Sequence, residues 1–160
     1  MNKFIGVSLA LLLVASTASG VVIESAAAHM IDMDTLSATM LTSRGFTSGA
    51  IVNFDGSAIL GNTAKFVAST AEVANIISSM RNPINFIKAN GVVLGGLNYS
   101  FVSYDRGILV AETISSGLMV TRLRVKWLIG VYALPFKTFI LNRDLARIIF
   151  QGVADWCTTR

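Results

Sequence analysis

Residues 90–135 read NGVVLGGLNYSFVSYDRGILVAETISSGLMVTRLRVKWLIGVYALP, and no other part of the chain says as much about the fold. This stretch contains four or five short apolar runs, separated by Gly95-Gly96, Asp105-Arg106-Gly107 and Ser115-Ser116-Gly117. Glycine adopts the positive φ of tight turns without steric cost, so each separator predicts a chain reversal. Short loops between consecutive strands in turn predict an antiparallel meander.

The last strand of this meander is expected to be long, running from Leu118 through Leu123 to Tyr132. Within it three cations alternate with three apolar residues, in the order Arg122, Leu123, Arg124, Val125, Lys126 and Trp127. Side chains alternate between the two faces of a strand, so we expect the cations to share one face and the apolar residues to enter the core. Beyond them, up to Tyr132, both faces turn apolar, which predicts helices on both sides of the sheet.

Helices and a further hairpin are predicted before the meander. Met33, Leu36 and Met40 recur at helical spacing and predict a short amphipathic helix from Met30 to Leu41. Asp55-Gly56 then lies between two apolar runs and predicts a hairpin.

Two more helices are expected. Ser69 precedes Glu72 by three residues, the spacing of a capping box, and predicts a helix from Thr70 to Met80. Near the C-terminus an apolar stripe predicts a helix that packs on the sheet through Leu141, Leu145, Ile148, Gly152 and Trp156. The sum is an α+β domain with one antiparallel sheet.

Residues 1–20 have the pattern of a secretory leader. Lys3 supplies a positive start, an apolar run follows from Phe4 to Val14, and Ala18-Ser19-Gly20 offers small residues for cleavage. We therefore expect a signal peptide at 1–20 and a single domain at 21–160.

Composition excludes several classes of function. Thirteen Lys and Arg against nine Asp and Glu give a net charge of +4, too little for a nucleic-acid-binding surface. His29 is the only histidine and Cys157 the only cysteine, so no catalytic triad, metal cluster or internal disulfide can be assembled from them. We predict no catalytic residue, no metal site and no cofactor, and hence a protein that is not an enzyme.

The chain resembles profilins of the plant and protist type. Residues 93–99, Val-Leu-Gly-Gly-Leu-Asn-Tyr, are similar to the family's Leu-Gly-Gly-x-x-Tyr hairpin. Gly130-Val131-Tyr132 followed by Pro135 is similar to its Gly-Ile-Tyr-x-x-Pro strand end. The resemblance extends from about Ala26 to Val153. It implies a profilin-like fold, with N- and C-terminal helices packed on one face of the meander sheet and shorter helices on the other.

Two ligand sites of the family are altered in this sequence. Profilins bind proline-rich ligands on an aromatic platform, and the resemblance implies that its positions here are Ala27, Met30, Ile59 and Ile148, none of them aromatic. Trp156 could replace one ring only in part. Plant-type members also carry a basic segment associated with phosphoinositides, where this chain has residues 111–114, Ala-Glu-Thr-Ile. We predict that proline-rich ligands and phosphoinositide headgroups both bind weakly.

The family's actin-facing surface is formed by the third helix, the later strands and the start of the C-terminal helix. The resemblance implies that this surface carries seven cations here: Arg81, Lys88, Arg122, Arg124, Lys126, Lys137 and Arg143. Such cations can steer association with an acidic actin surface, with apolar neighbours supplying the affinity. They can equally form a solvated face that keeps the domain soluble.

Two hypotheses follow for function. The first is a binding protein for actin monomers that regulates polymerisation, which places it in the cytoplasm. The second is a secreted profilin-like recognition module that no longer binds actin, as the leader suggests. Asn98-Tyr99-Ser100 has the form of an N-glycosylation acceptor, which becomes relevant on a eukaryotic secretory route.

Overall fold

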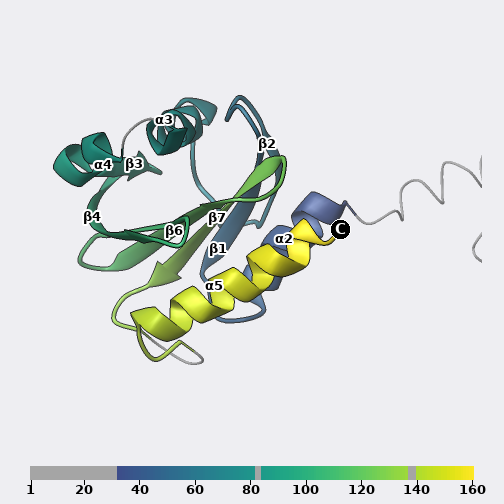
Figure 1. The fold of residues 1–160 in the computed structure, drawn as a ribbon. Helices are drawn as coiled ribbons and strands as arrows, with labels where there is room; N and C mark the ends of the chain where they lie inside the picture. Colours follow the sequence, from purple (N-terminus) through teal and green to yellow (C-terminus); the bar gives the residue numbers. More distant parts are fainter. Residues whose placement is uncertain (1–31, 82–83, 137–139) are drawn as a thin grey trace, which may run out of the picture. The chain divides into compact units, whose positions relative to one another are not determined.

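The computed structural model describes residues 32–81, 84–136 and 140–160 (Figure 1). The leader predicted at 1–20 lies outside these residues. The elements, all within the unit Met33–Arg160, are α2 (Met33–Thr42), β1 (Ser48–Asn53), β2 (Ile59–Asn62), α3 (Thr70–Arg81), α4 (Asn85–Asn90), β3 (Val92–Leu94), β4 (Leu97–Asp105), β5 (Ile108–Glu112), β6 (Ser116–Arg122), β7 (Lys126–Ala133) and α5 (Arg143–Thr158).

The strands form one seven-stranded antiparallel sheet in the order β2-β1-β7-β6-β5-β4-β3. Strands β3 to β7 are neighbours in sequence order, which confirms the predicted meander, and β7 returns beside β1. Figure 1 shows α2 and α5 side by side, with α3 and α4 together on the other side of the sheet. This is the predicted α+β fold.

The sheet separates two hydrophobic cores. Ile129 of β7 belongs to the core under α3 and α4, whereas its neighbour Leu128 belongs to the core under α2 and α5. Both side chains are fully buried, as predicted for a strand with helices on both sides. Two hairpins are also confirmed: β1 pairs with β2 across Asp55-Gly56, and Gly95-Gly96 connects β3 to β4 with positive φ at both residues.

The prediction of one long last strand was wrong, because the chain turns back at residues 123–125 and forms two strands instead. Arg122 ends β6, Lys126 begins β7, and Arg122 pairs with Trp127 across the hairpin. No residue of this turn has a positive φ, so it needs no glycine and left no signal in the sequence. Val125 was expected in the core but is 65% exposed.

The turn also places the cations on different faces. Arg122 lies on the same face of β6 as Leu118 and Val120, which belong to the core under α3 and α4. Lys126 lies on the same face of β7 as Leu128 and therefore faces α2 and α5. The prediction that Arg122 and Lys126 share one face was wrong.

Helix α2 buries a different side from the one predicted. Its buried residues are Ser37, Ala38 and Leu41, whereas Met33 is exposed. The helix lies so close to β2 that a Cβ on Gly61 would overlap the backbone of Asp34 and Thr35. Two of the three buried side chains of α2, Ser37 and Ala38, are small, so the hydrophobic pattern does not mark the buried side.

Helix α5 packs on the sheet as predicted, but the predicted stripe was wrong. Its buried residues are Ala146, Phe150, Val153 and Ala154. Phe150 Cε1 lies only 2.9 Å from the position that a Cβ on Gly130 would occupy. The large ring therefore packs against a point of β7 that has no side chain. Leu141 and Ile148, from the predicted stripe, are 72% and 67% exposed.

The capping box of α3 is confirmed. The Ser69 backbone N–H donates to Glu72 Oε2 at 3.2 Å, and the Glu72 N–H donates to Ser69 Oγ at 3.1 Å. The same carboxylate accepts the Gly96 N–H at 3.0 Å and so connects the start of α3 to the β3–β4 turn. These hydrogen bonds, led by the one from Gly96, hold the pKa of Glu72 below its usual value.

Candidate functional site

The edge of the sheet at β4 is open over most of its length. Strand β3 has three residues and pairs only with Leu97, Asn98 and Tyr99. Among the described residues, β4 beyond Tyr99 therefore pairs with β5 alone. An open strand edge offers backbone groups and side chains to a partner.

Among the residues that the structure describes, no helix covers one end of the sheet beside this edge. Ser100 pairs with Glu112, which lies on the same face as Val110, a fully buried residue of the α2 and α5 core. Asn98 lies on that face too, two residues before Ser100, yet both are exposed. The reason is that α5 begins only at Arg143, beside Glu112.

Arg143 is held at this end of the sheet by Glu112. Its Nε donates to Glu112 Oε2 at 2.6 Å and its Nη2 to Oε1 at 2.8 Å, a bidentate pair. The Tyr132 hydroxyl donates to the same carboxylate at 2.9 Å. The Glu112 side chain is only 13% exposed, so this cluster anchors the start of α5 to β5.

The cluster shifts the pKa of each member. The hydrogen bond from Arg143, assisted by the one from Tyr132, holds the pKa of Glu112 below its usual value. Burial and the neighbouring carboxylate raise the pKa of Tyr132, and the Glu112 carboxylate raises that of Arg143. At neutral pH the cluster therefore contains an ionised pair and a neutral phenol.

Helix α5 is attached to β4 by a second arginine. Arg147 Nη2 donates to Ser103 Oγ at 2.8 Å, and its Nη1 donates to the Asp105 carbonyl oxygen at 3.4 Å. The exposed Leu141 and Ile148 lie in the same part of the chain. Both are close in sequence to Arg143 or Arg147, the residues that attach α5 to β5 and β4.

Helix α4 borders β4 from the other face of the sheet. Lys88 Nζ lies 6.0 Å from the centre of the Phe101 ring of β4. Phe86 is exposed and, together with Val93 of β3, lines a hollow of ≈ 570 Å³. We call the following set the β4 surface; it contains the half-exposed Arg143 and the exposed residues of α4, β3, β4 and the start of α5: Phe86, Lys88, Val93, Asn98, Ser100, Leu141, Arg143 and Ile148.

Arg81 and Arg122 meet at a different place. Their guanidinium carbons lie 4.3 and 4.8 Å from the centre of the Phe54 ring, within the range of cation–π contacts. Trp127 Nε1 donates to the Phe54 carbonyl oxygen at 2.9 Å and fixes this segment. Both arginines line a hollow of ≈ 440 Å³ with Arg106.

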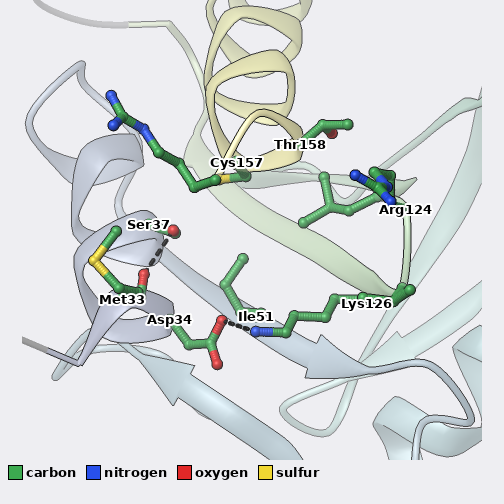
Figure 2. Close-up of a pocket in the computed structure, with 11 residues that line it drawn as sticks. Met33, Asp34, Ser37, Ile51, Arg124, Lys126, Cys157 and Thr158 are labelled. Carbon is green, nitrogen blue, oxygen red and sulfur yellow. Dashed lines mark hydrogen bonds and ion pairs between the residues drawn. The ribbon is translucent and has the colours of Figure 1, made fainter.

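Lys126 and Arg124 line a third hollow, of ≈ 230 Å³, at the start of α2 and the end of α5 (Figure 2). Lys126 Nζ lies 2.7 Å from Asp34 Oδ1, and Figure 2 shows this ion pair across the hollow. Cys157 also lines it, and burial raises the pKa of its thiol. The thiol is therefore not activated for chemistry.

Six of the seven cations expected on one surface lie in the described residues, and they are divided among three places. Lys88 and Arg143 lie on the β4 surface, whereas four others lie at the two hollows described above. Lys137 lies outside the described residues. Sequence reasoning missed Glu112 and Arg147; a lone carboxylate at the end of a buried strand was the only signal for Glu112.

The profilin family model matches residues 33–148, which include every strand and helices α2, α3 and α4. The chain belongs to the profilin family. Members of this family are binding proteins and not enzymes. Within residues 32–81, 84–136 and 140–160, no group of three His, Cys, Asp or Glu side chains could hold a metal ion. In the same residues no helix is long and apolar enough to cross a membrane.

Solved profilins share this fold at low identity. Acanthamoeba castellanii profilin II is 22% identical, with a TM-score of 0.63 over 76% of this chain and 96% of its own. Schizosaccharomyces pombe profilin is 15% identical, with a TM-score of 0.66 over 79% and 97%. LokiProfilin2, solved in complex with rabbit actin, is 16% identical, with a TM-score of 0.58 over 76% and 91%. A search of curated proteins gave no match.

Of the four positions expected to form the polyproline platform, the two that the structure describes, Ile59 and Ile148, do not meet. Ala27 and Met30 lie outside the described residues. Ile59 packs against the core under α3 and α4, whereas Ile148 lies exposed on α5, on the other side of the sheet. Trp156, the possible substitute ring, lies under the Arg160 guanidinium at 4.8 Å.

Proposed function

We propose that this profilin binds monomeric actin through the β4 surface and so regulates actin assembly. Two related profilins, LokiProfilin1 and LokiProfilin2, have been solved in complex with rabbit actin. The family's actin-facing surface is built from the third helix, the later strands and the start of the C-terminal helix, and the β4 surface shares with it α4 and the start of α5. The observation that carries the proposal is the open, partly apolar edge of β4 beside the start of α5.

The exposed apolar side chains would supply most of the affinity. Leu141 and Ile148 are 72% and 67% exposed, and burying side chains of this size against a partner is favourable by about 1.5–3 kcal/mol each. Lys88 adds an exposed cation that can accelerate encounter with an acidic surface. Arg143 is already paired with Glu112, so its contribution is to position α5.

Spontaneous assembly of pyrene-labelled actin tests this proposal. The protein should slow assembly, and Ile148→Asp should weaken its affinity for actin monomers by about tenfold or more, because a carboxylate would then be buried in the interface. Lys88→Glu should weaken binding more at low than at high salt. The matched controls are Val125→Asp and Arg124→Glu, the same changes at exposed positions of the β6–β7 turn.

The controls should bind actin as the unmodified protein does. The proposal would be refuted if the unmodified protein left actin assembly unchanged. It would be refuted equally if the turn variants lost as much affinity as the two β4-surface variants, because the binding face would then lie elsewhere.

We also infer that proline-rich ligands bind weakly. Helix α2 has no aromatic residue, and Ile59 and Ile148 lie on different sides of the sheet. A polyproline peptide should therefore cause no saturable change in tryptophan fluorescence. Saturable quenching, lost in Trp156→Leu, would show that a platform exists after all.

Weak binding of phosphoinositide headgroups is inferred for the segment 111–114. Glu112 replaces a cation there, and its ion pair with Arg143 keeps the carboxylate ionised at neutral pH. The pair has no net charge, so this segment offers no electrostatic attraction to phosphate. Sedimentation with vesicles containing phosphoinositides should leave the protein in the supernatant, and recovery in the pellet would contradict the inference.

A further inference from the structure

Asn98-Tyr99-Ser100 is the only Asn-x-Ser/Thr triplet in the chain. The glycosylation machinery of the endoplasmic reticulum requires the asparagine carboxamide and a hydroxyl two residues later. By itself such a triplet is weak evidence, because short motifs occur by chance. Its position in the fold and the leader expected at residues 1–20 supply the rest.

The structure presents both side chains to solvent. Asn98 lies two residues after the Gly95-Gly96 turn, near the start of β4. Because residues i and i+2 of a strand lie on one face, Ser100 lies beside Asn98 on the same face. Tyr99 between them is 3% exposed and points into the core, where its hydroxyl accepts a hydrogen bond from Ser116. The buried tyrosine thus fixes the direction in which both polar side chains point.

Neither acceptor side chain is engaged in holding the fold. In the part of the chain that the structure describes, the side chains of Asn98 and Ser100 form no hydrogen bond with another residue. Gly91 lies against the carboxamide, where an added Cβ would come within 2.8 Å of Asn98 Oδ1. Modification of Asn98 therefore breaks no hydrogen bond between its side chain and another described residue.

We propose that Asn98 is an N-glycosylation acceptor, and that a glycan at this position closes the β4 surface. Its Nδ2 forms a bond to the anomeric carbon of a lipid-pyrophosphate-linked oligosaccharide. The bond from that carbon to the pyrophosphate oxygen breaks, the lipid pyrophosphate leaves, and one proton of the carboxamide passes to a base of the transferase. The folded domain contributes only the exposed acceptor.

The second part of this proposal rests on the proposed function, because Asn98 lies within the β4 surface. Its neighbour across the hairpin is Val93, and Ser100 beside it pairs with Glu112. A bulky hydrophilic glycan at this point would keep a protein partner from reaching the open edge. The compartment would then determine the activity: the unmodified protein binds actin, and the glycosylated protein does not.

The test is expression of the full chain, with its own leader, in cultured eukaryotic cells, followed by peptide mass spectrometry. Secreted protein should begin near Val21 and carry a glycan on Asn98, which peptide-N-glycosidase removes with conversion of Asn98 to aspartate. Asn98→Gln and Ser100→Ala should each abolish the modification. Asn62→Gln is the matched control, since Asn62 is exposed but has alanine two residues later.

Unmodified Asn98 in the chain with its own leader would overturn the assignment, wherever the protein is found. A second form of the protein, with residues 1–20 replaced by a proven leader, then tells whether the acceptor or the native leader failed. For the second part, glycosylated and enzymatically deglycosylated protein are compared in the actin assembly assay. Binding only after deglycosylation is expected, and equal binding by both forms would overturn the closure. Absence of binding by both would refute the actin proposal while leaving the glycan in place.

Discussion

Arg143 lies on the β4 surface, but both oxygens of Glu112 already hold its guanidinium, at 2.6 and 2.8 Å. Lys126 is similarly held by Asp34 at 2.7 Å. Positive residues in a sequence therefore overstate the charge that a partner meets. At the scale of single residues, the exposed apolar side chains Leu141 and Ile148 distinguish the β4 surface better than its cations do.

Glu112→Gln should lower the free energy of unfolding at pH 7 by about 1–3 kcal/mol, because a charged, bidentate hydrogen bond is lost. The pKa of Glu112 in the folded state is held below its usual value of 4.5. Its stabilisation is therefore fully present above pH 4.5 and is lost as the pH falls through the folded-state pKa. The difference in stability between the two proteins should shrink below pH 4.5.

Urea denaturation of both proteins at pH 7 and at acidic pH measures this difference. Other carboxylates with lowered pKa values, such as Glu72, are present in both proteins, so their effect cancels. Asp144→Asn, an exposed change at the same end of α5, should cost less than about 0.5 kcal/mol. A difference for Glu112→Gln that stayed constant with pH would contradict the ionic role.

At the scale of elements, the sequence predicted most strands because their turns contain glycine at positive φ, as at Gly56, Gly95 and Gly96. It missed the β6–β7 turn, whose residues all keep negative φ and leave no mark in composition. It also chose the wrong side of α2 and α5. In both helices the buried side depends on how closely the sheet approaches, which residues distant in the sequence decide.

Gly61→Ala tests this close approach of α2 to β2. An added Cβ would overlap backbone atoms of Asp34 and Thr35, which cannot yield as a flexible side chain would. We expect a loss of about 1–3 kcal/mol in thermal or urea unfolding. Gly152→Ala is the matched control, since its Cβ meets nothing within 4 Å and alanine favours a helix, so it should stabilise by up to about 1 kcal/mol. Equal effects of the two changes would contradict the packing described for α2.

At the scale of the whole domain, the sheet separates two groups of candidate residues along its strands. Glu112 pairs with Gly117 at one end of β6, and Arg122 ends that strand at the other, about 17 Å away. The β4 surface reaches the first end, whereas the arginines around Phe54 and the Lys126–Asp34 pair lie at the second. The family and fold could be predicted from local motifs. The division of the cations could not, because it depends on one unmarked turn that reverses the chain between Arg122 and Lys126.

Hydrogen–deuterium exchange of this profilin, with and without monomeric actin, tests the docking of actin on the β4 surface most directly. Actin should slow exchange in α4, in β4 and at the start of α5, and should leave the β6–β7 turn and α2 unchanged. Protection confined to the β6–β7 turn and α2, or no protection at saturating actin, would contradict the proposed docking.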